Sequence, residues 1–267
     1  MMIIFWDFDG TLANSEKKFY LILKQYIVDK IPKVIINIEK FTEQFYYQFC
    51  SGKKFYQDFE ILGEEGIIDY SKVTQDDLSN FLDYLTQELK DVKEGEITLT
   101  KGMDELLLKL SKIEKIKMVI DTNARKSDLY YKSQPLKNEI INEMIKNNNI
   151  YAAPELSDDL EYLEIEKYKG KTKPNPAVFI YTIEDLKKNN VEIGNIIIVE
   201  DSSSAVAGGR NFVRSEYAKN KLKDSKIKIV GYTAGDHKPD GKRLSESGAD
   251  IIIDNADKLY NFIMDNL

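Results

Sequence analysis

The sequence predicts an α/β protein with a parallel sheet covered by helices on both faces and with one all-helical insert. Two observations support this fold class. The first is a series of short, bulky apolar runs, typical of buried parallel strands, at residues 2–6, 116–120, 195–199, 227–232 and 250–253. The second is the helical spacing of apolar residues between most of these runs, since strands that alternate with helices form parallel sheets. Between the first two runs, residues 15–96 show helical spacing and no convincing strand.

The remaining elements follow from the same patterns. Within the insert, apolar residues at helical spacing predict helices over residues 19–31, 38–50 and 75–89. Outside it, they predict one helix that begins with residues 102–108 and three more over residues 176–188, 203–218 and 257–266. One further strand is predicted at residues 150–153. Right-handed crossovers between parallel strands then fix most of the topology. Residues 124–149 are mostly polar and predict no clear element, and Gly208 and Gly209 weaken the helix that contains them.

The composition is that of an acidic globular protein. The chain has 267 residues, of which 42% are hydrophobic and 31% charged, with a net charge of −7. This balance excludes a disordered chain and gives no reason to expect a nucleic-acid partner. Cys50 and His237 are the only residues of their types, which excludes an internal disulfide and a zinc site built from Cys or His. We expect no membrane span and no secretory signal, because the apolar runs are too short, and therefore a cytoplasmic location.

The strongest chemical signal follows the first apolar run. Asp7 and Asp9 are separated by one residue, so they face the same side of an extended chain, while Phe8 turns toward the core. Gly10 then allows a sharp turn close to a ligand. Two neighbouring carboxylates repel each other, and a hard cation such as Mg²⁺ offsets this repulsion. An aspartate beside a metal can also attack a phosphoryl group, whereas the plainer interpretation is a polar turn after a strand.

Two further candidate groups follow later in the chain. Thr122 and Asn123 end the strand at residues 116–120, where both can donate a hydrogen bond to a phosphoryl oxygen, although such residues also serve in ordinary turns. Lys173 lies between a polar segment and Pro174, just ahead of a helix that Asn175 is suited to cap. A lysine held there can neutralise both a carboxylate and a phosphate.

An acidic pair ends the strand at residues 195–199. Glu200 and Asp201 would complete a cluster of carboxylates with Asp7 and Asp9, because the carboxyl ends of parallel strands meet at one edge of the sheet. The alternative role of Asp201 is to cap the helix that follows it. Both roles are compatible with one position.

Taken in order, these motifs resemble those of the haloacid dehalogenase-like hydrolase superfamily. The matching runs are DFDGTL at residues 7–12, TN at residues 122–123, KPNP at residues 173–176 and ED at residues 200–201. The last run resembles the branch that contains β-phosphoglucomutase and related sugar-phosphate phosphatases. The resemblance implies a Rossmann-like core formed by residues 1–14 and 97–267, and an all-helical cap formed by residues 15–96.

The resemblance also implies a Mg²⁺-dependent phosphohydrolase that acts on a small phosphorylated metabolite. Asp7 would attack phosphorus, Asp9 would protonate the leaving alcohol and then activate water, and Lys173 would stabilise the transferring group. The other implied roles are phosphate binding by Thr122, Asn123 and Lys173, and Mg²⁺ binding by Asp7, Asp9 and Asp201 with Glu200 in the outer shell. A sugar-phosphate mutase and a non-catalytic binding protein on the same fold are the alternatives, while Asp9 argues against a dehalogenase.

Substrate selectivity is expected from the cap. Gly52, Lys53 and Lys54 follow a predicted helix there and are the first candidates, with Arg125 as a weaker one. The competing interpretation is a C-cap glycine followed by two surface lysines. The sequence leaves the identity of the substrate and the oligomeric state open.

Overall fold

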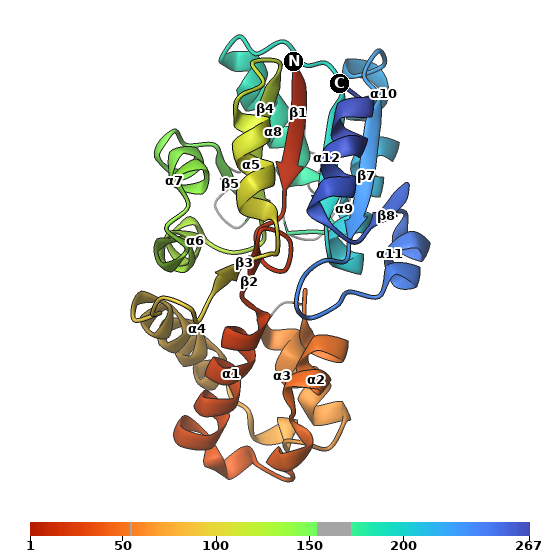
Figure 1. Cartoon of the computed structure of the whole chain (residues 1–267). Helices are drawn as coiled ribbons and strands as arrows, with labels where there is room; N and C mark the ends of the chain where they lie inside the picture. The colour runs from red at the N-terminus through yellow and green to blue at the C-terminus, as the bar shows by residue number, and fades with distance from the viewer. Residues whose placement is uncertain (54, 154–171) are drawn as a thin grey trace.

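A computed structural model describes residues 1–53, 55–153 and 172–267, and it contains the predicted parallel sheet (Figure 1). The strand order is β5-β4-β1-β6-β7-β8, and each neighbouring pair is parallel. The strands are β1 (Met2–Trp6), β4 (Ile116–Thr122), β5 (Ile150–Ala152), β6 (Ile196–Glu200), β7 (Ile227–Tyr232) and β8 (Ile251–Ile253). The chain leaves β1 for β4 on one side and later returns to β6 on the other side. This reversal of direction places the switch point of the topology at the carboxyl end of β1.

Helices cover both faces of the sheet. They must do so because successive side chains of a strand point to opposite faces, and in these strands both sets are apolar. Ile4 and Trp6 of β1 face one apolar cluster, and Ile3 and Phe5 face the other. The first face is covered by α5 (Met103–Ser111), α7 (Glu139–Lys146) and α12 (Ala256–Asp265), and the second by α8 (Ala177–Lys188), α9 (Ser203–Arg214), α10 (Glu216–Lys221) and α11 (Gly241–Ser247). The α/β fold class predicted from the sequence is therefore confirmed.

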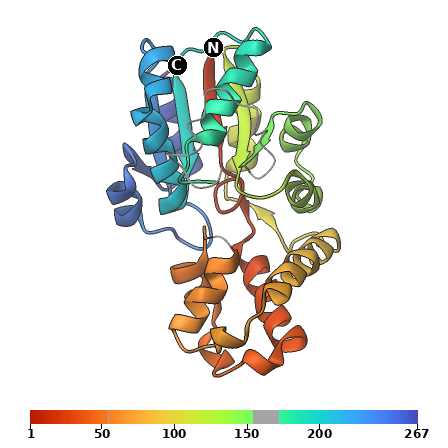
Figure 2. The same ribbon diagram turned by 180° about the vertical axis from the view of Figure 1, so that it is seen from behind.

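A helical insert formed by residues 16–90 lies between β2 (Ala13–Asn14) and β3 (Thr98–Leu99), which pair antiparallel where the chain leaves and re-enters the core. Its helices are α1 (Glu16–Lys30), α2 (Glu43–Phe45), α3 (Phe55–Glu64) and α4 (Gln75–Lys90). Figures 1 and 2 show these helices as a lobe at the end of the sheet opposite to the two chain termini. The lobe has its own apolar cluster, which includes Tyr26, Phe59 and Phe81. Among the described residues, no helix is both long and apolar enough to cross a membrane.

Two predicted helices are wrong in detail. The helix predicted over residues 38–50 is a 3₁₀ turn, then α2, then a π-helical turn over Tyr46–Cys50, and Thr42 caps the new start by accepting from the Phe45 N–H at 3.1 Å. The helix predicted over residues 203–218 breaks at Ser215 and not at its glycines. Gly209 lies against the sheet, where a Cβ would meet Ile198 and Ile229 at 3.4 Å. These glycines therefore allow close packing of α9 on the sheet.

The polar segment at residues 124–149 contains helices that the sequence pattern did not predict. They are α6 (Lys126–Ser133) and α7, separated by a 3₁₀ turn. Asn138 starts α7 by accepting from the Ile141 N–H at 2.9 Å. The apolar face of α7 is short, because only Ile141 and Met144 are fully buried, and α6 buries the side chains of Asp128 and Lys132. When buried positions of a helix are polar, as Asp128 and Lys132 are, apolar residues no longer recur at helical spacing. The sequence pattern then does not reveal the helix.

Candidate active site

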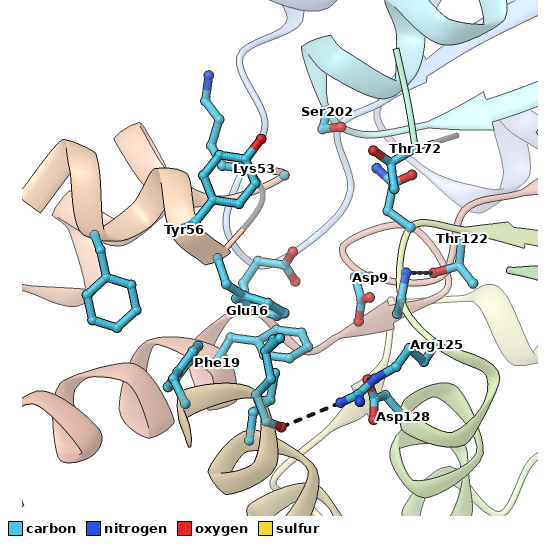
Figure 3. Close-up of a pocket in the computed structure, with 18 of the residues that line it drawn as sticks. Asp9, Glu16, Phe19, Lys53, Tyr56, Thr122, Arg125, Asp128, Thr172 and Ser202 are labelled. Atoms are coloured by element: carbon cyan, nitrogen blue, oxygen red, sulfur yellow. Dashed lines mark hydrogen bonds and ion pairs between the residues drawn. The ribbon is translucent and has the colours of Figure 1, made fainter. Parts of the chain in front are cut away.

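The predicted site residues gather at the carboxyl ends of β1, β4 and β6, beside the helical insert. A cavity of about 710 Å³ opens there, between the core and the insert. Of the residues predicted from sequence, its walls include Asp7, Asp9, Gly52, Lys53, Thr122, Asn123, Arg125, Lys173 and Asp201. Figure 3 shows Asp9, Thr122 and Arg125 on one side of this space and Lys53 and Tyr56 on the other. Glu200 lies behind the cavity wall, and Lys54 lies outside the described residues.

Lys173 forms the buried centre of the site. Its Nζ lies 3.0 Å from Asp7 Oδ1, 2.8 Å from Asp121 Oδ2 and 2.8 Å from Glu200 Oε1. Burial alone would lower the pKa of Lys173, but the charges of Asp121, Asp7 and Glu200 outweigh it and raise the pKa well above its usual range. Lys173 is therefore a permanent cation. Asp121, at the end of β4, is a full member of this cluster.

The backbone around Lys173 is held by local hydrogen bonds. Asn123 Oδ1 accepts from the Lys173 N–H at 2.9 Å, which ties the end of β4 to the lysine loop. Asn175 Oδ1 accepts from the Ala177 N–H at 2.8 Å, so it caps the start of α8 as expected. Gly208 of α9 lies close to the lysine stem, since a Cβ there would be 3.4 Å from the Cβ of Lys173. These contacts fix the direction in which the lysine side chain points.

More negative charge surrounds Asp7 than one lysine can neutralise. Burial raises the pKa of Asp7 well above its usual range, Lys173 acts in the opposite direction, and the charges of Asp201, Asp121 and Asp9 raise the pKa further. Burial likewise raises the pKa of Glu200 in spite of Lys173. The residual repulsion indicates that the site is built to receive further positive charge.

Asp9 has a partner that sequence reasoning missed. The Lys132 Nζ donates to Asp9 Oδ1 at 2.7 Å and to Oδ2 at 2.5 Å, and Ser15 Oγ donates to Oδ1 at 2.6 Å. Lys132 has no exposed side-chain surface, and its ammonium lies 5.2 Å from the ring centre of Phe8 and 5.1 Å from that of Phe19. Because Lys132 lies in the polar segment that predicted no element, the sequence held no signal for this role.

A second pair that the sequence did not indicate is formed by His237 and Asp201. His237 Nε2 is 2.9 Å from Asp201 Oδ2. Burial lowers the pKa of His237, but Asp201, then Glu16 and Asp236, outweigh it and raise the pKa to about 9. Burial raises the pKa of Glu16 to about 7. Gly10 makes room for this pair, because its φ is +79° and a Cβ would lie only 2.0 Å from Asp201 Oδ2.

The residues predicted to bind Mg²⁺ fit this ion by their chemistry. Carboxylate oxygens are the ligands that Mg²⁺ prefers, and the repulsion around Asp7 favours a divalent cation. Within residues 1–53, 55–153 and 172–267, however, no three acidic, histidine or cysteine side chains surround a common point. Instead, each of the three predicted direct ligands faces a protein cation: Asp7 faces Lys173, Asp9 faces Lys132, and Asp201 faces His237.

Two further contacts connect the helical insert to the site. Gly52 has a φ of +74°, and a Cβ there would lie 2.7 Å from the Cβ of Ser202, so the loop before α3 touches the start of α9. Arg125 Nη2 donates to Thr86 Oγ1 at 2.5 Å, and Arg125 Nε pairs with Asp128 at 3.0 Å. Arg125 therefore joins α6 of the core to α4 of the insert.

Comparisons with known proteins agree with this architecture. A family model described as haloacid dehalogenase-like hydrolase matches residues 1–212. A conserved haloacid dehalogenase-like protein from Agrobacterium tumefaciens is 18% identical, with a TM-score of 0.66 over 99% of this chain and 97% of that one. A predicted phosphoglycolate phosphatase from Haemophilus somnus is 17% identical, with a TM-score of 0.59 over 98% and 97% of the two chains. An archaeal β-phosphoglucomutase from Pyrococcus is 19% identical, with a TM-score of 0.58 over 99% and 100%. A comparison with curated proteins gives no match.

Proposed function

Because this chain belongs to the haloacid dehalogenase-like hydrolase family, we propose that it is a Mg²⁺-dependent phosphohydrolase for a small phosphorylated metabolite. The observation that supports this most directly is the pairing of two aspartates in one cavity with two different lysines. Lys173 contacts Asp7 at 3.0 Å, and Lys132 contacts Asp9 at 2.7 Å. Two carboxylates with separate partners can take separate roles, one as a nucleophile and one in proton transfer.

In the proposed reaction, a carboxylate oxygen of Asp7 attacks phosphorus and the bond to the leaving alcohol breaks. Asp9 gives its proton to the departing oxygen, which leaves an aspartyl-phosphate on Asp7. Water then attacks this phosphoryl group, Asp9 takes the proton from that water, and Asp7 is released with inorganic phosphate. Lys173 and Thr122 both line the cavity, where the lysine ammonium and the threonine hydroxyl would stabilise charge on the phosphoryl oxygens.

Mg²⁺ would be held by Asp7, Asp9 and Asp201, with Glu200 in the outer shell. Bound there, the ion would neutralise charge on the phosphoryl oxygens during transfer. The protein's own part is to hold these carboxylates in place. Lys173 contacts Asp7 and opposes the rise of its pKa, and His237 lies within hydrogen-bond distance of Asp201.

A sugar-phosphate mutase is the second candidate, because one structural neighbour is named a β-phosphoglucomutase. Both activities would use the same attack by Asp7. They differ in the second step, since a mutase returns the phosphoryl group to a sugar hydroxyl and must exclude water. Release of inorganic phosphate therefore separates the two.

The test is a panel of phosphorylated metabolites incubated with the protein and Mg²⁺, with released phosphate measured for each. We expect release from at least one ester, loss of release in excess chelator, and recovery when Mg²⁺ is restored. Isomerisation of a sugar phosphate without release would favour the mutase. Full turnover in excess chelator would exclude the Mg²⁺-dependent mechanism.

A further inference from the structure

We infer that the leaving group of the substrate is apolar or aromatic and has no second anionic group, an inference that rests on the proposed function. The wall of the cavity opposite the catalytic carboxylates belongs to the helical insert and is largely apolar. It is formed by Phe19, Phe55, Tyr56, Tyr70, Leu78 and Leu82. Three of them keep a large exposed surface, with exposed fractions of 44% for Tyr56, 40% for Leu82 and 37% for Tyr70. Large apolar side chains left open beside a site are typical of a binding surface.

The charges along the cavity disfavour a second anion on the substrate. Three cations that line it have carboxylate partners already: Lys173 with Asp7, Lys132 with Asp9, and Arg125 with Asp128. Acidic residues also lie on the side of the insert, where Glu16 and Glu60 line the cavity. A carboxylate or second phosphate beside these three cations would lose water without gaining an unpaired cation.

Among the residues that the structure describes, Lys53 is the cavity-lining cation that argues for an anionic substrate. It lines the cavity, is exposed, and makes no ion pair within the described part of the chain. Burial raises the pKa of Asp58, and the charge of Lys53 acts in the opposite direction. Asp58 is a buried carboxylate whose Oδ1 has no hydrogen-bond partner among the described residues. Because water and salt screen the charge of an exposed lysine, we assign the leaving group to the apolar wall.

The volume of the cavity agrees with this assignment. At about 710 Å³ it falls within the range of pockets that enclose ligands of drug size. A leaving group of two or three carbon atoms would contact the phosphate end and leave the aromatic wall in water. A longer alkyl or aryl group would cover Tyr56 and Leu82, and burial of their surface would strengthen binding.

The test uses alkylphosphonates, which keep the phosphate-like group but cannot be hydrolysed, and measures their Kd by calorimetry with Mg²⁺ present. We expect Kd to fall about tenfold or more from ethylphosphonate to hexylphosphonate, since one fully buried methylene strengthens binding by up to about fourfold. We also expect 6-phosphonohexanoate, in which a carboxylate replaces the terminal methyl group, to bind more weakly than hexylphosphonate. Equal Kd values along the series, or tighter binding of the carboxylate, would overturn the inference.

Two matched variants locate the effect. Leu82→Gln should weaken hexylphosphonate binding at least fivefold and leave ethylphosphonate binding unchanged. Leu21→Gln, at a leucine of α1 that is 49% exposed and does not line the cavity, should change neither. Tyr56→Ser gives a second variant of the same wall if Leu82→Gln folds poorly. Equal losses in Leu82→Gln and Leu21→Gln would overturn the assignment to this wall.

The binding measurement also separates this inference from the proposed function. If phosphonates bind in the expected order but no phosphate ester is hydrolysed, the proposed function fails and the assignment of the wall stands. If esters are hydrolysed but the Kd of the phosphonates does not depend on chain length, the assignment of the wall fails and the proposed function stands. If no phosphonate binds at all, both fail.

Discussion

Lys132 and Asp9 form an ion pair across 123 positions of sequence, with the lysine Nζ 2.7 and 2.5 Å from the two carboxylate oxygens. The lysine comes from α6 of the core, and its side chain lies between the rings of Phe8, from the core, and Phe19, from the insert. The pair therefore depends on the position of the insert as well as on the core. An insert that moves would uncover Lys132 and change the surroundings of the proposed proton-transfer group.

Lys132→Met is expected to lower kcat about tenfold to a hundredfold with little change in KM, because Asp9 loses the group that orients it. The methionine can keep the apolar contacts of the lysine stem with Phe8 and Phe19. Steady-state kinetics on a hydrolysed ester, together with the melting temperature, measure both effects. Lys109→Met, at a half-exposed lysine of α5, is the control. An unchanged kcat in Lys132→Met would show that the pair is not needed for turnover.

Lys173→Met is expected to destabilise the protein by about 3–5 kcal/mol, because it leaves buried carboxylates without their shared cation. Asp121 and Glu200 have no exposed side-chain surface, so neither can be rehydrated without unfolding. Urea unfolding of metal-free protein gives the loss directly.

The triple variant Lys173→Met/Asp121→Asn/Glu200→Gln should recover part of the stability lost in Lys173→Met, since two of the orphaned charges are then absent. It should recover no activity, because Asp7 still lacks its cation. If the triple variant were no more stable than Lys173→Met, charge repulsion would not be the cause of the loss.

Asp7→Asn is expected to abolish phosphate release, because an amide is not a competent nucleophile. Asp9→Asn should lower the rate by about 10²–10⁴, the usual range for a general acid or base, and should let the aspartyl-phosphate accumulate on Asp7. Phosphate release and intact-protein mass, which detects the added phosphoryl group, measure the two outcomes. Retention of more than a small fraction of the rate by Asp7→Asn would contradict the covalent mechanism.

Local sequence was enough to predict the parts of the site that follow strands directly. Asp7, Asp9, Thr122 and Asp201 come one to three residues after the end of a strand or at its last residue, so the topology of the sheet brings them together. The sheet itself followed from the apolar runs. These features depend on a few neighbouring residues.

The rest of the site depends on contacts between distant segments. Lys132 lies in a helix whose buried face is partly polar, and His237 lies in a loop after β7, so neither has a local pattern that predicts its partner. Glu16 begins a helix, where an acidic residue is common for reasons of the helix dipole alone. Its burial beside Asp9 and His237 appears only when the insert is packed on the core.

Glu16 should make the metal-free protein less stable as pH rises from 4.5 to 7. Burial raises the pKa of Glu16 from 4.5 to about 7 in the folded protein, so the folded state binds more protons than the unfolded state in this window. The destabilising contribution of the Glu16 charge is absent below the pKa that Glu16 has in the unfolded state, and it is complete above the pKa that Glu16 has in the folded state. The shift corresponds to about 3 kcal/mol of unfolding free energy as an upper value.

Glu16→Gln removes the titrating group and keeps a side chain of similar size. In excess chelator, its unfolding free energy, measured with urea, should fall much less than that of the wild type between pH 4.5 and 7. His237 gives the internal comparison, because its pKa of about 9 lies above its ordinary value of 6.5 and its stabilising effect is lost between those two values. His237→Asn should therefore flatten the stability curve above pH 6.5, whereas Glu16→Gln should flatten it mainly below pH 7. If both variants followed the wild-type curve between pH 4.5 and 9, neither Glu16 nor His237 would determine how the stability of this protein depends on pH.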